Sequence, residues 1–339
     1  MADKVKIAVV GCGQRGPGHA LMIQQSDTLE LAAVCDIDEE RACRLGEELK
    51  VDAVFDLQGI LERDDIAAVS IASHTPHHAG IALDVARAGK HFLCEKPFAD
   101  SIDSGREVVT AAEEAGVVAI VGFQNRFAPI SLRLKELSQQ IDIVQVTVTQ
   151  HRGFFNPQYF YAEHYGGIMD GLSHDMDLAL WWAGMTPKRV AGHQRRGAFK
   201  PLKNTIEFVN ILAECENGDE TRMVNMSGSM ASIGMSNVYQ LVGKRGCASS
   251  TNKNHIQYAF HEGFAEDKKP INSETHQEEL DWQGRDFQLA MWNHFGQCVL
   301  EKKTDVAPAA SLREGLVQVA VSQAGAESAE TGRIVELDL

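Results

Sequence analysis

The chain has 339 residues, which is long enough for two domains that each bury a core of their own. Its hydrophobic fraction of 44% and charged fraction of 23% are typical of a soluble globular protein. The formal net charge of −15 argues against a nucleic-acid partner, because phosphate backbones select basic protein surfaces.

No apolar run approaches the roughly 20 residues that are needed to span a bilayer. The N-terminal MADKVK enters the first predicted strand directly and leaves no room for a signal peptide. The seven cysteines are scattered and form no C-x-x-C pair, which indicates reduced thiols. We therefore expect a cytoplasmic protein that binds neither membranes nor nucleic acids.

The first predicted element is a buried parallel strand, Val5–Val10, which runs into glycines with the spacing G-x-G-x-x-G. Glycines let the backbone turn sharply, and they let a pyrophosphate approach the N-terminus of the helix predicted over residues 18–26. An arginine in this turn can contact a phosphate or be solvated. The residues of the turn assigned to cofactor binding are Gly11, Gly13, Gln14, Arg15 and Gly16.

A second buried strand over residues 29–35 ends at Asp36, which lies 36 − 16 = 20 positions past the last glycine. Dinucleotide-binding folds place there the carboxylate that accepts hydrogen bonds from the adenosine ribose. Asp38 lies nearby and no arginine follows directly, so the sequence favours NAD over NADP. The alternative is a structural glycine turn followed by an ordinary acidic loop.

Further strands are predicted over residues 67–73, 91–95 and 117–123, and they alternate with helices over 39–49, 79–88 and 104–115. This alternation predicts a doubly wound parallel sheet, here assigned to a Rossmann domain of residues 1–123. The turn after the strand at 67–73 should line the cofactor cleft, although a capping turn is an alternative. Its residues assigned to the cofactor are Ser73, Thr75, Pro76 and His78.

Glu95, Lys96 and Pro97 follow the strand at 91–95, at the sheet edge where ligands of open α/β sheets bind. A lysine there can hydrogen-bond a substrate hydroxyl and stabilise developing negative charge. We assign Glu95 and Lys96 to cofactor binding, and Lys96 also to catalysis and substrate binding. A surface lysine on a turn is the structural alternative.

The pattern changes after residue 123. A helix over 130–139 precedes alternating strand-like runs at 142–153, 189–196, 205–215, 221–230 and 237–244, with a helix over 166–184 among them. Two helices around a turn occupy 284–329, and a short strand closes the chain. We predict that residues 124–339 form a substrate-binding and oligomerisation domain of α+β class, with an open, mostly antiparallel sheet.

Asp170 and His174 are spaced i, i+4 on the helix over 166–184, so both side chains share one face. Oxidation of an alcohol requires the hydroxyl proton to leave, and a histidine is the natural base near neutral pH. The alternatives are a polar helix face and a metal site. No third ligand has a convincing spacing, so no metal is predicted.

Several motifs together resemble the glucose–fructose oxidoreductase / inositol dehydrogenase (Gfo/Idh/MocA) family in order and approximate spacing. They are GCGQRG, CDID, SHTPHHAGIAL, AGKHFLCEKP, VGFQNRF, GGIMDGLSHDMDL and the closing ESAETGRIVEL. The resemblance covers nearly the whole chain. It implies a Rossmann domain followed by a domain whose open sheet often pairs subunits, and hence a homodimer or homotetramer.

In that family the lysine of E-K-P and the aspartate and histidine of D-x-x-x-H face the nicotinamide and the sugar, which matches Lys96, Asp170 and His174. Asn125 of VGFQNRF is assigned to the cofactor, and Arg152, with Lys96, Asp170 and His174, to the substrate. The short aromatic loop over residues 153–165 departs from the family's pattern and implies an individual substrate wall.

The resemblance implies an NAD-dependent oxidoreductase that moves hydride between the nicotinamide and a secondary alcohol of a sugar, cyclitol or related polyol. Two alternatives stay open. One is an NAD-dependent glycosidase that works by transient oxidation and elimination. The other is a non-catalytic nucleotide-sensing protein of the same fold.

Overall fold

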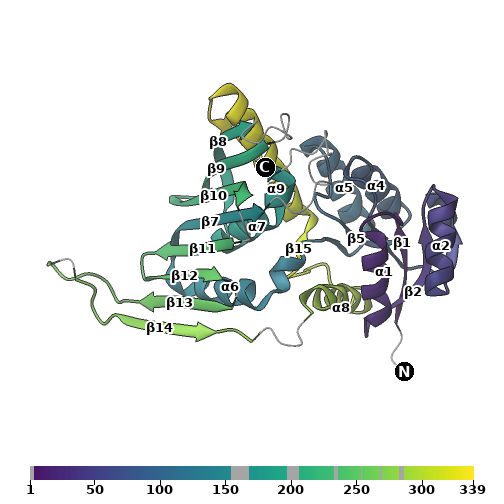
Figure 1. Cartoon of the computed structure of the whole chain (residues 1–339), viewed down its shortest axis with the longest axis horizontal. Coiled ribbons are helices and arrows are strands. Elements are labelled where there is room, and N and C mark those ends of the chain that lie inside the picture. The colour runs from purple at the N-terminus through teal and green to yellow at the C-terminus, as the bar shows by residue number, and fades with distance from the viewer. Residues whose placement is uncertain are drawn as a thin grey trace. The chain divides into compact units, whose positions relative to one another are not determined.

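The computed structural model describes residues 4–153, 168–196, 206–232, 236–252, 254–267, 269–281 and 286–339. The chain divides into two compact units (Figure 1). The first unit comprises Met1–Phe127 and Arg285–Val319, and the second comprises Ala128–Gly284 and Ala320–Leu339.

The first unit is built on a seven-stranded sheet with the order β15-β6-β5-β4-β1-β2-β3. All neighbouring strands are parallel except β15, which pairs antiparallel with β6. The chain winds outwards in both directions from the central β1–β4 pair, and this reversal marks the crevice in which such sheets bind dinucleotides. The strands are β1 Val5–Val10, β2 Leu29–Cys35, β3 Asp52–Val54, β4 Ala68–Ile71, β5 His91–Cys94, β6 Ala119–Val121 and β15 Ala310–Ser311.

Helices cover both faces of this sheet, which explains why its strands are apolar runs without alternation. Ile7 and Val9 of β1 belong to one core cluster with residues of α1, α2 and α8. Ala8 and Val10 point the other way and belong to a cluster with residues of α3, α4 and α5. The helices are α1 Gly16–Gln25, α2 Glu39–Leu49, α3 Leu57–Leu61, α4 His78–Arg87, α5 Ile102–Ala115 and α8 Phe287–Leu300.

Helix α8 belongs to the first unit, although it follows the second sheet in sequence. Trp292 and Phe295 are buried in the cluster of α1 and β1, and the Ser26 hydroxyl donates to Asn293 Oδ1 at 2.6 Å. The sequence-based division assigned all of 124–339 to one domain. The apolar face of α8 instead groups residues 285–319 with the Rossmann sheet, because it completes the cover over β1.

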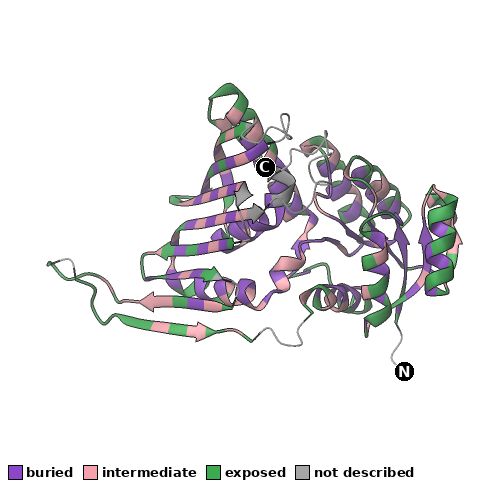
Figure 2. Ribbon diagram, in the orientation of Figure 1, coloured by how far each residue is buried: buried purple, intermediate pink, exposed green. Residues whose placement is uncertain are grey.

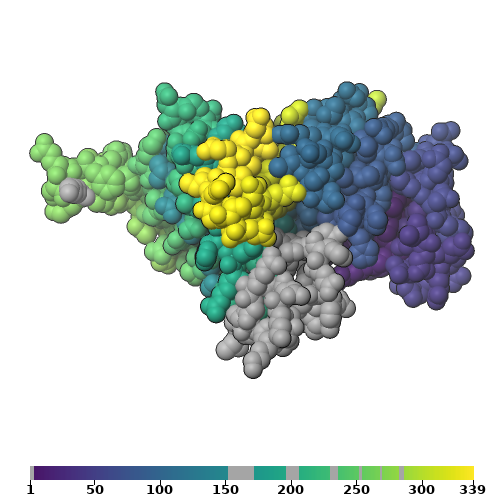
Figure 3. Space-filling view, turned by 90° about the horizontal axis from the view of Figure 1, so that it is seen from above, coloured from purple at the N-terminus to yellow at the C-terminus, as the bar shows by residue number. Residues whose placement is uncertain are grey.

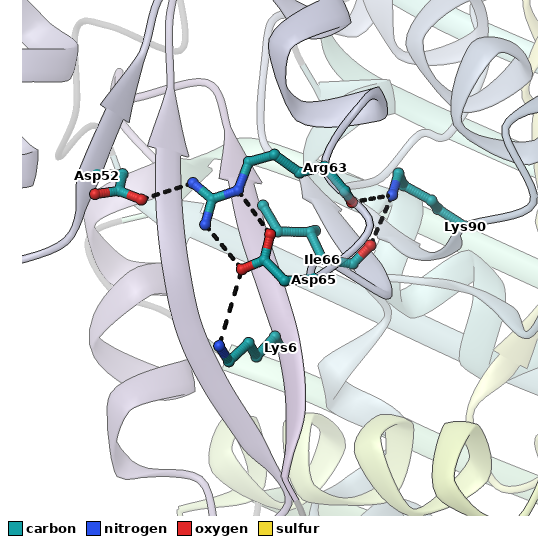
Figure 4. A network of polar contacts seen from close by, with 6 residues as sticks. All are labelled: Lys6, Asp52, Arg63, Asp65, Ile66 and Lys90. Carbon is teal, nitrogen blue, oxygen red and sulfur yellow. Dashed lines mark hydrogen bonds and ion pairs between the residues drawn. The ribbon is translucent and has the colours of Figure 1, made fainter.

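Lys90 of the AGKHFLCEKP run is a structural residue of the first unit (Figure 4). Its buried ammonium donates to the carbonyl oxygens of Arg63 at 2.8 Å and Ile66 at 2.7 Å. The Arg63 guanidinium in turn pairs with Asp52 and Asp65 at 2.7 and 2.9 Å. Lys90 therefore ties the loop before β4 to the start of β5.

The second unit contains a nine-stranded sheet with the order β14-β13-β12-β11-β7-β10-β9-β8-β16. All its neighbours are antiparallel except β10 and β7, which are parallel. The predicted fold class is thus confirmed. The strands are β7 Ile143–Gly153, β8 Thr186–Arg196, β9 Ile206–Asn217, β10 Glu220–Ser232, β11 Ser236–Gly243, β12 Gly246–Asn252, β13 His255–Phe260, β14 Glu274–Glu279 and β16 Val335–Glu336.

One face of this sheet is covered by α6 (Pro129–Ile141), α7 (Ile168–Ala183) and the second half of α9 (Leu312–Thr331). Buried residues alternate with more exposed ones along β9 and β11 (Figure 2). Gly192 is required on β8, because a Cβ there would lie 2.0 Å from the Gly325 carbonyl oxygen of α9.

The C-terminal residues (yellow in Figure 3) lie against this sheet through the pairing of β16 with β8. On the other face of the sheet, Leu212 and Val242 are 42% and 44% exposed. Apolar side chains of this size are therefore accessible on that face of the isolated chain.

Candidate active site

Each of the three glycines after β1 has a different structural role. Gly11 has φ +101°, and a Cβ there would lie 2.7 Å from backbone atoms of Ala72 and Ser73. A Cβ at Gly16 would lie 1.8 Å from the Gly11 carbonyl oxygen, so only glycine fits at position 16 in this turn. Nothing lies within 4 Å of a Cβ at Gly13, which leaves room for a ligand to approach the backbone.

Helix α1 begins at Gly16, two residues earlier than predicted, with Pro17 in its first turn. Arg15 occupies the N-cap and supplies no side-chain acceptor to the first N–H groups. Such N–H groups favour a phosphate. Gln14 and Arg15 are exposed at this rim.

Asp36 is fixed against the glycine turn. Its Oδ2 accepts the backbone N–H of Cys12 at 2.7 Å, and its Oδ1 accepts the N–H of Asp38 at 2.9 Å. A carboxylate has about four acceptor sites, so two sites are left for ribose hydroxyls. Asp38 is the N-cap of α2, where its side chain accepts the N–H of Arg41.

Cys12 is a buried residue of this turn. Burial and the nearby Asp36 charge raise the pKa of its thiol to about 12. The thiol therefore stays protonated at neutral pH, which agrees with a small packing residue rather than a redox centre.

Lys96 follows a buried carboxylate, Glu95, which was predicted to bind the cofactor. Glu95 Oε1 lies 3.0 Å from His19 Nε2 and 4.0 Å from Arg15 Nε, and Oε2 accepts the Lys96 backbone N–H at 3.0 Å. His19 Nδ1 lies 2.9 Å from the Ser70 hydroxyl. These contacts connect the first turn of α1, the strand β4 and the E-K-P turn.

The Glu95 carboxylate is negatively charged at neutral pH. Burial by itself raises the pKa of this carboxyl, but the hydrogen bond and charge of His19, with the charges of Arg15 and Lys96, lower it below its ordinary value. Glu95 thus orders the backbone of Lys96 and places negative charge near its ammonium.

His78 is buried between two of the predicted cofactor loops. Its Nδ1 lies 2.8 Å from the Pro97 carbonyl oxygen and its Nε2 lies 2.9 Å from the Ser73 carbonyl oxygen. Burial lowers its pKa, although the two backbone contacts and Glu95 oppose this shift. The ring therefore connects the two loops, and direct contact of His78 with a cofactor stays a prediction.

Three other predicted residues of the first unit, Thr75, Pro76 and Asn125, lie in short 3-10 helices. Thr75 and Pro76 begin a 3-10 helix, η1 (Thr75–His77), directly after the β4 turn. Asn125 is half-buried in η2 (Gln124–Phe127), which follows β6. Both short helices lie after the carboxyl ends of parallel strands, where ligands of such sheets bind.

In the second unit, His174 lies on α7 within a continuously buried stretch over residues 172–180. Asp175 and Asp177 on the same helix are also buried. The side chains of Arg152 and Asp170 lie outside the described residues, as do residues 154–167, which include most of the aromatic loop predicted over 153–165. The predicted roles of Arg152 and Asp170 therefore stay predictions.

Asp175 is a residue that the sequence reasoning missed. Its Oδ1 accepts from Asn237 Nδ2 and from the Tyr239 hydroxyl, both at 3.1 Å, and its Oδ2 accepts from Gln150 Nε2. Its position next to His174 was visible, but the donors come from β7 and β11, which only the fold brings together.

Within the described ranges, no group of three or more histidine, cysteine, aspartate or glutamate side chains could hold a metal ion. No helix among those ranges is long and apolar enough to cross a membrane.

A family model described as "Oxidoreductase family, NAD-binding Rossmann fold" matches residues 5–123. A second, described as "Oxidoreductase family, C-terminal alpha/beta domain", matches residues 140–337. The chain belongs to the Gfo/Idh/MocA oxidoreductase family. Residues 5–123 are thus the family's NAD-binding Rossmann domain.

Relatives of this Gfo/Idh/MocA protein include inositol dehydrogenases. Inositol 2-dehydrogenase 2 of Saccharopolyspora erythraea is 32% identical over 222 residues, which are 63% of this chain and 64% of that protein. Uncharacterized oxidoreductase YrbE of Bacillus subtilis is 29% identical over 188 residues, 54% of this chain and 55% of that protein. The aligned part therefore spans between about half and two thirds of these relatives.

Solved structures share the fold over the whole length. A levoglucosan dehydrogenase in complex with NADH and levoglucosan is 17% identical with a TM-score of 0.83, covering 98% of this chain and 99% of that one. An oxidoreductase from Agrobacterium radiobacter in complex with NAD+, L-tartaric acid and magnesium is 20% identical with a TM-score of 0.82, covering 98% of both chains.

Proposed function

We propose that this chain is an NAD-dependent dehydrogenase that transfers hydride between the nicotinamide and a secondary alcohol carbon of a sugar, cyclitol or related polyol. The observation that carries the proposal is the turn over residues 11–16 together with Asp36. The open backbone at Gly13 suits a pyrophosphate, and the two remaining acceptor sites of Asp36 suit a ribose diol.

The residues fit NAD better than NADP. The Asp36 carboxylate would repel a 2′-phosphate, and the Arg41 side chain is paired with Asp38 at 3.0 Å. Gly11, Gly13, Gln14, Arg15 and Gly16 would hold the pyrophosphate. Ser73, Thr75, Pro76, Glu95 and Asn125 are proposed to line the remaining length of the cofactor.

When bound, NAD supplies the hydride acceptor for oxidation of the alcohol carbon. In the proposed reaction His174 takes the hydroxyl proton while the C–H electron pair leaves as hydride, so the alcohol becomes a ketone. The Lys96 ammonium hydrogen-bonds the same oxygen and stabilises the negative charge that develops on it. Asp170 positions the substrate and the base, and Arg152 contacts the substrate.

The test is a panel of inositols, aldoses, other polyols and glycosides with NAD or NADP. Absorbance of the reduced nicotinamide and chromatography of the products are followed in parallel, with Lys96→Ala as the matched inactive control. We expect NADH to accumulate with at least one polyol, a higher kcat/KM with NAD than with NADP, and loss of turnover in Lys96→Ala.

Two outcomes would overturn the proposal in favour of the alternatives. Release of sugar from a glycoside without NADH accumulation would indicate the glycosidase. A Lys96→Ala variant that binds NAD and keeps the protein's biological activity would indicate the sensor. Better turnover with NADP would refute the role of Asp36.

We also propose that the accessible sheet face of the second unit pairs with a second copy, so that the protein is a homodimer or homotetramer. Light scattering coupled to size-exclusion chromatography measures this directly, and a monomeric mass at micromolar concentration would contradict it. The cytoplasmic location stays a prediction.

A further inference from the structure

A series of buried polar contacts links helix α1 to the E-K-P turn of the first unit. The His19 ring lies 3.0 Å from Glu95 Oε1 through its Nε2 and 2.9 Å from the Ser70 hydroxyl through its Nδ1. The exposed fractions of His19, Glu95 and Ser70 are 9%, 8% and 0%. The Trp292 ring lies edge-on to the imidazole, with 5.0 Å between the ring centroids. The His19 ring is therefore fixed by contacts from β4, from the turn after β5 and from α8.

These contacts suit both protonation states of the imidazole. In either state Nε2 donates to the Glu95 carboxylate. The neutral ring then accepts the Ser70 hydroxyl proton at Nδ1, and the protonated ring donates to the Ser70 oxygen. Ser70 is fully buried, so its hydroxyl cannot meet a substrate, and the serine–histidine–glutamate arrangement is not a nucleophilic site. The arrangement is instead suited to holding the Glu95 carboxylate.

The Glu95 carboxylate in turn holds the backbone in front of Pro97. Its Oε2 accepts the Lys96 N–H at 3.0 Å, while its Oε1 faces His19. Each oxygen thus has its own donor, so a carboxyl group that rotates away from His19 also withdraws its acceptor from the Lys96 amide. A buried carboxylate is costly unless its oxygens are hydrogen-bonded, so Glu95 keeps this orientation as long as His19 donates to it.

We propose that His19 is a positioning residue for Lys96, which acts through the Glu95 carboxylate and fixes the backbone of the E-K-P turn. This inference rests on the proposed function in one respect, that Lys96 hydrogen-bonds the reacting oxygen of the substrate. A displacement of about 1 Å at a reacting group can cost roughly 100-fold in rate. A donor that fixes the Lys96 backbone therefore bears on kcat.

Other charged groups also face Glu95 from neighbouring elements. Arg15 Nε lies 4.0 Å from Glu95 Oε1, and the Arg15 side chain is 48% exposed. The charges of Lys96 and of His78 on α4 interact with the Glu95 carboxylate as well. The half-exposed Arg15 is a weaker contact than a buried hydrogen bond, but its charge stays near Glu95 when His19 is substituted. We therefore expect a substitution of His19 to change the orientation of the carboxylate more than its charge.

Two amide side chains separate the two contacts of His19. In His19→Gln the amide nitrogen takes the place of the imidazole Nε2 and can still donate to Glu95. In His19→Asn the shorter side chain reaches only as far as the imidazole Nδ1, so the contact with Glu95 is lost and the contact with Ser70 is kept. His91→Gln is the control at the start of β5, where His91 Nδ1 accepts the Val118 N–H at 2.9 Å.

The first measurement is the hydrogen exchange of the Lys96 amide, by NMR of the full chain labelled with isotopic lysine, with Lys96→Arg to assign the signal. The Lys90 amide, which donates to the Val85 carbonyl oxygen at 3.1 Å, is the reference for a general loss of stability. Relative to this reference, we expect the Lys96 amide to exchange about 5- to 10-fold faster in His19→Asn. In His19→Gln and His91→Gln its exchange should stay within about 2-fold of the wild type.

The second measurement is kcat for an active polyol, which tests whether the effect passes through Glu95. We expect His19→Asn to lower kcat about 10- to 100-fold and His19→Gln to keep it within about 3-fold of the wild type. In a Glu95→Gln background, His19→Asn should change kcat by less than about 3-fold, because the side chain through which it acts is already altered. His91→Gln should leave kcat unchanged.

Three outcomes overturn the inference: wild-type exchange at Lys96 and wild-type kcat in His19→Asn, an equal loss in His19→Gln, or independent effects of the two substitutions in the double variant. If His19→Asn does not fold, Glu95→Gln decides, since wild-type exchange of the Lys96 amide in that variant would also overturn the inference. A wild type that turns over no polyol would refute the proposed function, whereas the exchange of the Lys96 amide would still test the link from His19 through Glu95.

Discussion

Asp36→Asn is the substitution that most directly tests the NAD cradle. The carboxylate of Asp36 accepts two backbone N–H groups, from Cys12 and Asp38. An asparagine in the same place has one acceptor oxygen, and its NH2 group must face one of these two donors. It also removes the charge that would meet the ribose hydroxyls.

The expected magnitude follows from the number of acceptor sites. With two of about four sites taken by backbone N–H groups, Asp36 can accept both ribose hydroxyls, and the amide can accept at most one of them. A hydrogen bond to a charged group is worth about 1.5–3 kcal/mol. We therefore expect the Kd for NAD to rise about 10- to 150-fold. Discrimination against NADP should weaken, because the repulsion of its 2′-phosphate is lost.

Asp38→Asn is the control. This substitution changes the net charge by the same amount as Asp36→Asn, at a position two residues away. Asparagine is as good an N-cap as aspartate, so α2 is retained. Calorimetric titration of NAD and NADP into the wild type and both variants measures the effect. Equal NAD affinity in Asp36→Asn and the wild type, or an equal loss in Asp38→Asn, would refute the proposed role of the Asp36 carboxylate.

Three further predictions concern the first unit. Lys96→Met should lower kcat about 100- to 1,000-fold, since the proposed role of the ammonium is to stabilise charge in the reaction. An unchanged kcat would contradict this role. Lys90→Met should lower the free energy of unfolding, measured by urea titration, by about 1–3 kcal/mol, because the carbonyl oxygens of Arg63 and Ile66 lose their donor. The affinity for NAD should be retained. An unchanged free energy of unfolding would contradict the structural role of the Lys90 ammonium. His78 and Glu95 both have lowered pKa values in the folded state, so their protonation favours unfolding. The urea midpoint should therefore fall as the pH drops below about 6.5, where His78 is protonated in the unfolded chain, and should fall further below about 4.5, where Glu95 is protonated in the unfolded chain. An unchanged urea midpoint of the wild type over this pH range would disprove the prediction.

Local patterns predicted much of the first unit, because strand and turn signals there depend on neighbours in sequence. The apolar run at Val5–Val10 and the glycines after it have steric requirements that hold in any fold of this class. Short strands were missed: β3 has three residues, and β15 has two. Strands of two or three residues are too short to show a periodic pattern in the sequence, and they are recognised only by their pairing with a neighbouring strand.

The second unit was harder to predict. Strands β12, β13 and β14 were not assigned, since polar sequences such as ETHQEE (274–279) lack apolar alternation. Their pairing is decided by the neighbouring strand and by turn geometry rather than by their own composition.

The sequence by itself determined the alternation of strands and helices in the Rossmann domain, the glycine turn and the place of Asp36, because backbone sterics and hydrophobic periodicity are local. Only the tertiary structure decided that His19 and Ser70 meet Glu95, that α8 completes the first core, and that three donors from two strands surround Asp175. Each of these contacts joins residues at least 25 positions apart in the sequence. Contacts of this kind depend on the tertiary fold, which the spacing of residues close together in the sequence does not determine.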